Sequence, residues 1–179
     1  MERRLGRVIE SSAGGTASKN AKTYKLALPS SWVAELKLDA KGSQVELHFD
    51  GSSIHIIPRL SLAEYIRSRK KLGHELLLLF YYDSETLCSV ICADYTEMDL
   101  CCENHTQDFL HTAFGSMPLP GWEDYLRFLE DRCVPRARDG LRHYLDALGL
   151  DEYEPLEIIK KTQGRMAGDE QWLKLEEVL

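Results

Sequence analysis

The chain has 179 residues, of which 44% are hydrophobic, and a formal net charge of −7. This length and composition are typical of a globular protein with one ordinary or two small domains, and they exclude collagen-like and wholly disordered chains. No stretch approaches the ~18 uncharged apolar residues of a membrane span, and no apolar signal-peptide core follows the first four residues. We therefore expect a cytoplasmic protein with no membrane partner.

Charge is distributed unevenly along the chain. Residues 1–72 contain 13 Lys and Arg against 7 Asp and Glu, a net +6, whereas residues 73–179 contain 9 against 22, a net −13. A polyanion is attracted to the first part and repelled by the second. The two parts are therefore expected to have different functions.

The first 58 residues are expected to form short strands and one short helix. Alternation of polar and apolar side chains predicts the strands, Pro29 ends the second of them, and Asp50-Gly51 is a tight-turn signal. A long loop rich in Gly and Ser separates the first two strands. The predicted order is strand, loop, strand, helix and hairpin, over residues 4–10, 11–21, 22–28, 30–36, 44–49 and 53–57.

A connector helix and an acidic domain are expected to follow. Ser61 and Glu64 form a capping-box pattern that opens a basic helix ending near Gly73, so residues 59–73 are predicted to be a connector. Residues 74–179 are predicted to be a mostly helical α+β domain with a small antiparallel sheet. Its strands are expected at 76–82, 86–93 and 171–175, and its helices at 104–114, 122–129, 137–148 and 156–162.

The amino-terminal pattern resembles a known family. A run of apolar residues ending in Pro29 leads into the short helix, Leu38 and Asp39 follow, and the hairpin of 45–57 completes the pattern. This arrangement is similar to that of the AbrB/MazE/SpoVT family of swapped-hairpin DNA-binding proteins, over about residues 1–58. The resemblance implies that two chains interleave their hairpins into one barrel-like homodimer. Because 58 residues hold little apolar surface per chain, a second copy can complete the core.

The resemblance also implies which residues meet double-stranded DNA, since the family presents arginines, lysines and polar loops on its dimer face. Carried over position by position, these residues are Arg3, Arg4, Arg7, Lys19, Asn20, Lys22 and Lys25. Two arginines and two lysines per chain, doubled by symmetry, can neutralise roughly six to eight phosphates, which predicts steeply salt-dependent binding. Asn20 is a candidate for reading an adenine edge. The loop at 11–21 is longer than in short family members, so its contacts stay open, and a solvated face on an ordinary small barrel remains the alternative.

The second half resembles, more faintly, a module near the amino end of some HipA-like toxin-associated proteins. The resemblance lies in Arg132-x-x-Pro135-x-x-Arg138, in a Leu-Gly-Leu turn at 148–150, and in Asp169-x-x-Trp172. It implies a protein-contact module rather than a kinase, because no phosphate-cradling Gly-rich loop or acidic metal-binding motif is present.

Two groups of charged residues are the candidates for binding a partner protein. They are Arg132, Arg136 and Arg138, at the point where Pro135 ends a helix, and Asp151, Glu152 and Glu154. The arginines can instead pair with Asp131 and Asp139 or cap helix carbonyls. That structural role is the stronger interpretation of the arginines.

The sequence predicts no enzyme, no metal and no cofactor. Cysteines 88, 92, 101, 102 and 133 are odd in number and include no CxxC pair, so buried thiols without disulfides are favoured over a metal site. His105 and His111 are six residues apart and would not face the same way on a helix. Asp and Glu are scattered, and no pattern indicates acid–base or nucleophilic catalysis.

Two functions are compatible with the charge distribution. The leading hypothesis is a dimeric DNA-binding transcription regulator, autoregulatory or antitoxin-like, whose acidic domain binds a toxin or another protein. The alternative is an inhibitor from a phage or mobile element, similar to an anti-CRISPR protein, whose acidic half imitates nucleic acid on a nuclease. The first requires the basic residues and the second requires the acidic ones.

Overall fold

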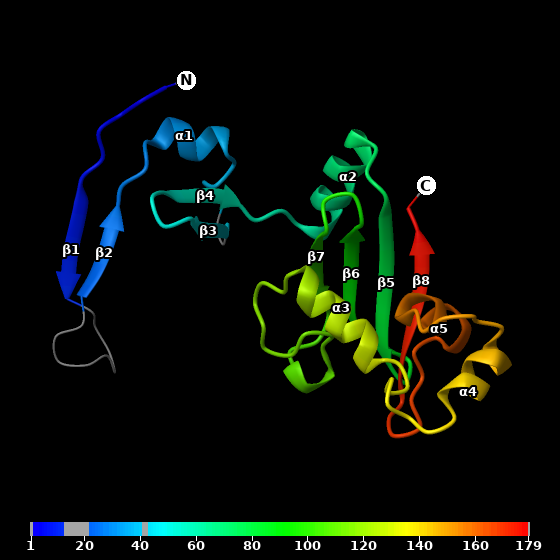
Figure 1. Ribbon diagram of the computed structural model, residues 1–179. Coiled ribbons are helices and arrows are strands. Elements are labelled where there is room, and N and C mark those ends of the chain that lie inside the picture. The colour runs from blue at the N-terminus through cyan, green and yellow to red at the C-terminus, as the bar shows by residue number, and fades with distance from the viewer. Residues whose placement is uncertain (1, 13–21, 41–42, 179) are drawn as a thin grey trace. The chain divides into compact units, whose positions relative to one another are not determined.

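The computed structural model describes residues 2–12, 22–40 and 43–178 (Figure 1). The chain divides into two compact units, Met1–Arg59 and Leu60–Leu179. The protein is α+β, and its described strands form three antiparallel sheets: β1-β2, β3-β4, and a four-stranded sheet in the order β7-β6-β5-β8. The predicted α+β class is therefore confirmed, the described residues form no closed barrel, and the swapped-hairpin dimer stays a prediction. The expectation that residues 74–179 are mostly helical is wrong, because the strands described in this part contain slightly more residues than its helices.

The elements of the first unit follow the predicted order. They are β1 (Val8–Ser12), β2 (Lys22–Leu26), α1 (Ser30–Glu35), β3 (Val45–Phe49) and β4 (Ile54–Pro58). The first strand was expected from Arg4 but begins at Val8, so the arginines before it lie in an extended segment outside the sheet. Pro29 directly precedes α1 and ends the extended segment after β2, as predicted.

The turn between β3 and β4 is organised by one carboxylate. Asp50 accepts hydrogen bonds from the backbone N–H groups of Ser52 and Ser53, both at 2.8 Å, and from their hydroxyls. These bonds, those of Ser53 first, hold the pKa of Asp50 well below its ordinary value. Gly51 has φ +92°, which an L side chain rarely adopts. The Asp-Gly signal of the sequence therefore corresponds to a side-chain-braced turn.

The second unit is built on the four-stranded sheet. Its elements are α2 (Leu62–Leu72), β5 (Leu76–Asp83), β6 (Thr86–Asp94), β7 (Asp99–Asn104), a 3-10 turn (Phe109–His111), α3 (Trp122–Asp131), α4 (Leu141–Leu148), α5 (Pro155–Thr162) and β8 (Gln171–Glu177). One sheet face packs against α3 and α5 in the larger core, in which Tyr125, Ile158 and Leu173 are fully buried. Successive side chains of a strand point to opposite faces. Leu76 accordingly joins a smaller cluster under α2, and Leu77 joins the larger core.

Helix α2 was predicted as a connector, but it packs on the sheet as part of the second unit. Its ends agree with the sequence signals, since Ser61 and Glu64 make the capping box and Gly73 closes the helix with φ +79°. Tyr65 of α2 is buried against Leu76 and Cys92. The boundary between the two units therefore lies before this helix.

A buried carboxylate fixes the end of α2 to the sheet. Asp94, at the end of β6, is fully buried and accepts a hydrogen bond of 2.7 Å from Nδ1 of His74. Burial alone raises the pKa of a carboxyl, but His74 and two backbone N–H groups hold the pKa of Asp94 below its ordinary value. Arg69 of α2 lies 3.5 Å from Asp94 and 3.0 Å from Asp99 of β7.

Two of the predicted helices differ from the structure. Residues 104–114 were expected to be helical, but β7 ends at Asn104 and only Phe109–His111 form a 3-10 turn. The fully buried Ser89 holds this segment, because its hydroxyl bonds the Asn104 side chain at 2.8 Å and accepts from the N–H of Ala113 at 3.1 Å. Helix α4 was expected from residue 137 but starts after Gly140, whose φ is +75°. In the first case the long-range contacts of Ser89 override the local helical pattern. In the second case the left-handed conformation of Gly140 sets the start of the helix.

Arg132 joins three segments at the end of α3. Only 6% of its surface is exposed, and its guanidinium donates two hydrogen bonds to the Gly164 carbonyl, at 3.0 and 2.8 Å. It also binds both carboxylate oxygens of Asp169, at 2.7 and 3.0 Å, and the backbone carbonyl of Gln171 at 2.9 Å. This side chain therefore connects α3 to the segment that leads into β8.

Replacing Arg132 with Met should lower the free energy of unfolding of the second unit by about 3 kcal/mol, because Asp169 and the Gly164 carbonyl lose their donor. Urea denaturation followed by circular dichroism measures this change. Arg136→Met is the matched control: Arg136 pairs with Glu130 at 2.8 Å but its side chain is 59% exposed. The control should cost about 1 kcal/mol or less. Equal losses in the two variants would show that Arg132 does not connect these segments.

Candidate nucleic-acid interface

The three arginines predicted to meet DNA lie in the extended segment before β1. Arg3, Arg4 and Arg7 are all exposed. Arg4 donates to the Glu2 carboxylate at 2.6 Å and lies over the ring of Trp32, 5.7 Å from its centre. Trp32 of α1 donates to the same carboxylate at 3.0 Å. Arg4 is therefore anchored to α1.

The two lysines of β2 lie on opposite faces of the β1-β2 hairpin. Lys22 is opposite Ser12 and shares its face with Glu10, whose carboxylate lies 2.9 Å from the ammonium. Lys25 is exposed on the other face, opposite Ile9. A single chain thus does not bring the predicted basic residues together on one surface. The candidates Lys19 and Asn20 lie outside the described residues.

The net charge of each part changes when the observed boundary between the units is used. The first unit, residues 1–59, contains nine Lys and Arg against six Asp and Glu, a net +3. Residues 1–72 have a net charge of +6, so half of this charge comes from residues 60–72, which contain α2 and belong to the second unit. That unit, residues 60–179, contains 13 Lys and Arg against 23 Asp and Glu, a net −10. The contrast is smaller than residues 1–72 suggested, but its sign is unchanged.

The hairpin β3-β4 has one face that consists entirely of apolar side chains. Its register pairs Val45 with Pro58, Leu47 with Ile56, and Phe49 with Ile54, and cross-strand partners share a face. We call these six residues the apolar hairpin face. The opposite face carries Glu46 and Ile57 together with His48 and His55. One mostly polar face and one fully apolar face are typical of a hairpin that belongs to a larger packed structure.

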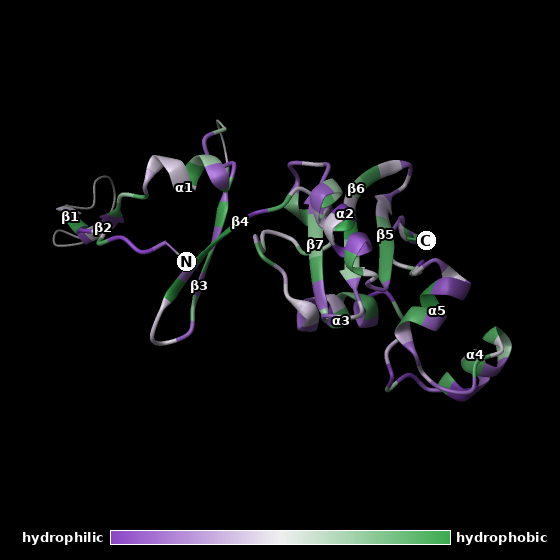
Figure 2. Ribbon diagram, turned by 90° about the horizontal axis from the view of Figure 1, so that it is seen from above, coloured by the Kyte–Doolittle hydropathy of each residue, from purple (hydrophilic) through white to green (hydrophobic). Residues whose placement is uncertain are grey.

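Much of the apolar hairpin face is exposed to solvent in the single chain. The exposed fractions are 66% for Leu47, 72% for Phe49 and 67% for Ile54. Figure 2 shows hydrophobic residues on both strands of this hairpin. The β1-β2 hairpin behaves similarly, since Val8 and Leu26 are paired across it and are 63% and 50% exposed. Among the described residues, none before Leu60 belongs to a hydrophobic core.

Isolated two-stranded hairpins are only marginally stable in water and normally need a third strand or a packing partner. The first unit contains two such hairpins and the short helix α1, which has no buried residue. The structure of one chain therefore leaves the apolar surface of this unit uncovered. Alternation at 45–49 and 54–58 allows this face to be found from the sequence, once the Asp-Gly turn sets the register.

The candidate partner-binding arginines are divided between two roles. Arg132 is buried and holds three segments together, so it is a structural residue rather than a surface contact. Arg136 pairs with Glu130 and lies over the ring of Tyr153, 4.3 Å from its centre, and Arg138 is exposed. Asp131 and Asp139 were the expected partners of these arginines. Arg132 instead pairs with Asp169, and Arg136 pairs with Glu130. The stronger interpretation, a structural role, therefore describes Arg132 correctly.

The acidic candidates lie in the connection between α4 and α5. Asp151, Glu152 and Glu154 are all exposed, and Glu154 directly precedes Pro155, the first residue of α5. The backbone carbonyl of Asp151 accepts a hydrogen bond from Arg142 at 2.7 Å, which ties the connection to α4. These carboxylates are therefore available to a basic partner.

Metal-ligating side chains are not grouped in the described residues, and Cys92 and Cys133 are buried. Within 2–12, 22–40 and 43–178, no group of three or more His, Cys, Asp and Glu side chains is arranged to hold a metal ion. Burial raises the pKa of Cys92 to about 12 and that of Cys133 to about 11. Both thiols are therefore protonated at neutral pH, and a thiol is a much weaker nucleophile than a thiolate. Over the same ranges no helix is long and apolar enough to cross a membrane.

Comparison with known proteins does not assign this chain to a family: no family model, no curated protein and no solved structure matches it. The resemblance to swapped-hairpin DNA-binding proteins therefore stays a prediction.

Proposed function

We propose that this protein is a homodimeric DNA-binding regulator, in which the first units of two chains interleave to form one DNA-binding module. In this proposal the second unit is a self-contained acidic domain that binds a partner protein. The single observation that supports it most is the apolar hairpin face, which one chain leaves exposed.

A second copy of the chain is the occupant that this face fits best. An interface formed by two copies is self-complementary, so the same apolar surface serves both sides. Fully burying a Leu, Ile or Phe side chain contributes roughly 1.5–3 kcal/mol. Six apolar side chains per chain can together offset the cost of association, roughly 4–15 kcal/mol. Both strands of each two-stranded sheet are also edge strands, and interleaving satisfies their outer backbone groups.

The exposed basic residues of the first unit are the proposed contacts to DNA phosphates. Arg3, Arg7 and Lys25 are exposed on one chain, and two-fold symmetry doubles their number. Arg4 and Lys22 contact Glu2 and Glu10, but these are exposed pairs, which contribute little to stability. DNA phosphates can therefore replace these carboxylates at low cost.

Replacing Leu47 with Glu should convert the dimer to a monomer, because it places a carboxylate in the apolar hairpin face. Sedimentation velocity of the full chain measures the result. His48→Glu is the matched control, since it adds the same group to the neighbouring position on the opposite face. The parent and His48→Glu are expected to sediment as dimers. A monomeric parent, or a Leu47→Glu variant that remains a dimer, would refute the proposed assembly.

DNA binding should depend strongly on salt. Fluorescence anisotropy with DNA from upstream of the protein's own gene is expected to show an affinity that falls about 10³- to 10⁴-fold between roughly 50 and 200 mM salt, for six to eight phosphate contacts per dimer. Because Lys22 and Lys25 lie on opposite faces of the hairpin, the double variant Lys22→Gln/Lys25→Gln should remove two contacts per dimer, whichever lysine meets DNA, and reduce the slope of log K against log salt by ~1.8.

Lys161→Gln on α5 of the second unit is the matched control for charge, and it should bind DNA as the parent does. Absent binding, or binding that does not change with salt, would end the DNA hypothesis. If the double variant has the same slope of log K against log salt as the parent, the DNA contacts do not lie on β2.

One observation favours the alternative function. The second unit has a net charge of −10, and its loop with Asp151, Glu152 and Glu154 is exposed. An inhibitor that imitates nucleic acid on a nuclease would use this charge. In that case the double lysine variant keeps its activity, whereas neutralising the three carboxylates abolishes it.

A further inference from the structure

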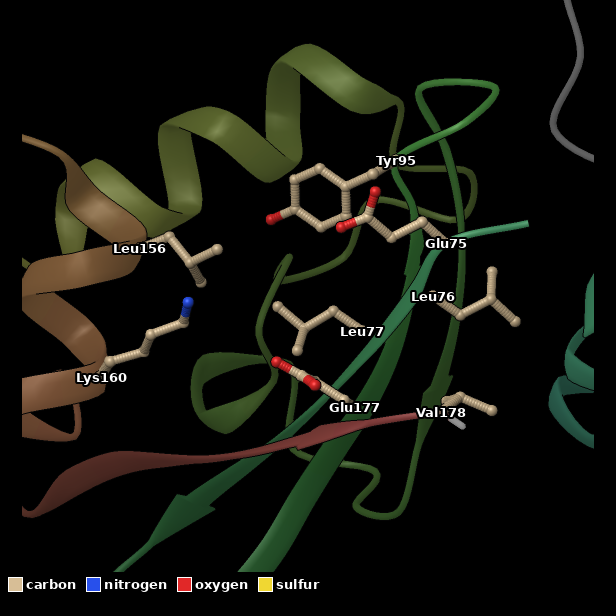
Figure 3. A pocket seen from close by; sticks show the side chains of 8 residues that line it. All are labelled: Glu75, Leu76, Leu77, Tyr95, Leu156, Lys160, Glu177 and Val178. Atoms are coloured by element: carbon tan, nitrogen blue, oxygen red, sulfur yellow. The ribbon is translucent and has the colours of Figure 1, made fainter. Parts of the chain in front are cut away.

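The second unit contains a cavity of about 280 Å³ that is independent of the DNA-binding proposal. It lies between α5 on one side and the first part of β5 and the last part of β8 on the other (Figure 3). Its lining residues are Glu75, Leu76, Leu77, Tyr95, Leu156, Lys160, Glu177 and Val178. The volume is near the lower end of the range for small-molecule sites, so it suits a small metabolite.

Apolar side chains form part of the wall of this cavity. Figure 3 shows Leu77 of β5 and Leu156 of α5 pointing toward each other across it, with the Tyr95 ring beside them. Leu76 and Val178 point away, in agreement with their place in the cluster under α2. The Tyr95 hydroxyl is 2.8 Å from the hydroxyl of Tyr125 in the larger core, which fixes the ring. The cavity therefore has a rigid apolar part.

Charges of both signs face each other across the same cavity. Lys160 extends from α5, and the carboxylates of Glu75 and Glu177 lie on the sheet side (Figure 3). The Lys160 ammonium donates to Glu157 on its own helix at 2.7 Å, and an ammonium has two further N–H groups. That hydrogen bond first, and the negative charge of Glu177 further, raise the pKa of Lys160, so it is charged at neutral pH.

The combination of these groups restricts the chemistry of a ligand. A purely anionic ligand is repelled by two carboxylates, and a purely cationic one leaves the ammonium with Glu157 as its partner and gains nothing from its remaining N–H groups. A molecule that carries both charges can pair its carboxylate with Lys160 and its ammonium with Glu75 or Glu177. Its remaining atoms would then lie against Leu77 and Leu156.

We propose that this cavity binds a free α-amino acid with an apolar side chain. The site gives the second unit a small-molecule ligand in addition to any protein partner. It involves no residue of the first unit, so the outcome of its test is independent of dimerisation and DNA binding.

Isothermal titration of the full-length protein with L-leucine tests the proposal, with N-acetyl-L-leucine and L-leucinamide as matched probes that lack one charge each. L-leucine is expected to bind at least about tenfold more tightly than either probe, since each loses one charge-assisted hydrogen bond. Lys160→Met should weaken L-leucine binding at least about tenfold and leave L-leucinamide unaffected. Lys161→Met, at the next position of α5, is the control and should bind as the parent does.

Three results would overturn the proposal. One is the absence of saturable L-leucine binding up to about 20 mM, which corresponds to a very weak interaction. Another is equal binding of all three probes, which would indicate an apolar cleft without recognition of charge. The third is an unchanged affinity in Lys160→Met, which would place the binding site elsewhere.

Discussion

The first unit of this protein has more apolar surface than one copy of it can bury. All six side chains on one face of β3-β4 are apolar, and Leu47, Phe49 and Ile54 are each about two-thirds exposed or more. Water penalises such a surface in proportion to its area, and a two-stranded hairpin cannot fold back to cover its own face. This constraint is the reason that we propose association as the central property of the unit. It is also the reason that we place function at an interface rather than in a cleft.

The second unit solves the same physical problem within one chain. Its sheet is covered by α3 and α5 on one face and partly by α2 on the other, and its buried charges Arg132 and Asp94 have partners. A unit that is stable alone can present fixed surfaces, such as an acidic loop and a charged cavity. The proposed division of labour follows from this difference: the first unit gains its structure from pairing, and the second keeps its structure whatever the first unit binds.

Local signals predicted the elements whose ends depend on neighbouring residues. The Ser61 and Glu64 capping box, the Asp50-Gly51 turn and Pro155 at the start of α5 are such cases. The sequence failed where distant residues decide: Ser89 holds the segment after β7 out of a helix, and α2 packs on the sheet through Tyr65, which is buried with Leu76 and Cys92. For the site, alternation predicts the apolar hairpin face, but charge counting did not show that Lys22 and Lys25 occupy opposite faces or that Arg132 is buried. The cavity beside Lys160 unites residues from 75 to 178 and has no local pattern.

The most direct test of the central claim is amide hydrogen exchange of the full chain over a series of protein concentrations. If a second copy completes the first unit, protection of residues 45–58 must fall on dilution as dimers dissociate, while protection of the core strands at 76–94 stays constant. Protection of residues 45–58 that persists at every concentration in a monomeric sample would contradict the account.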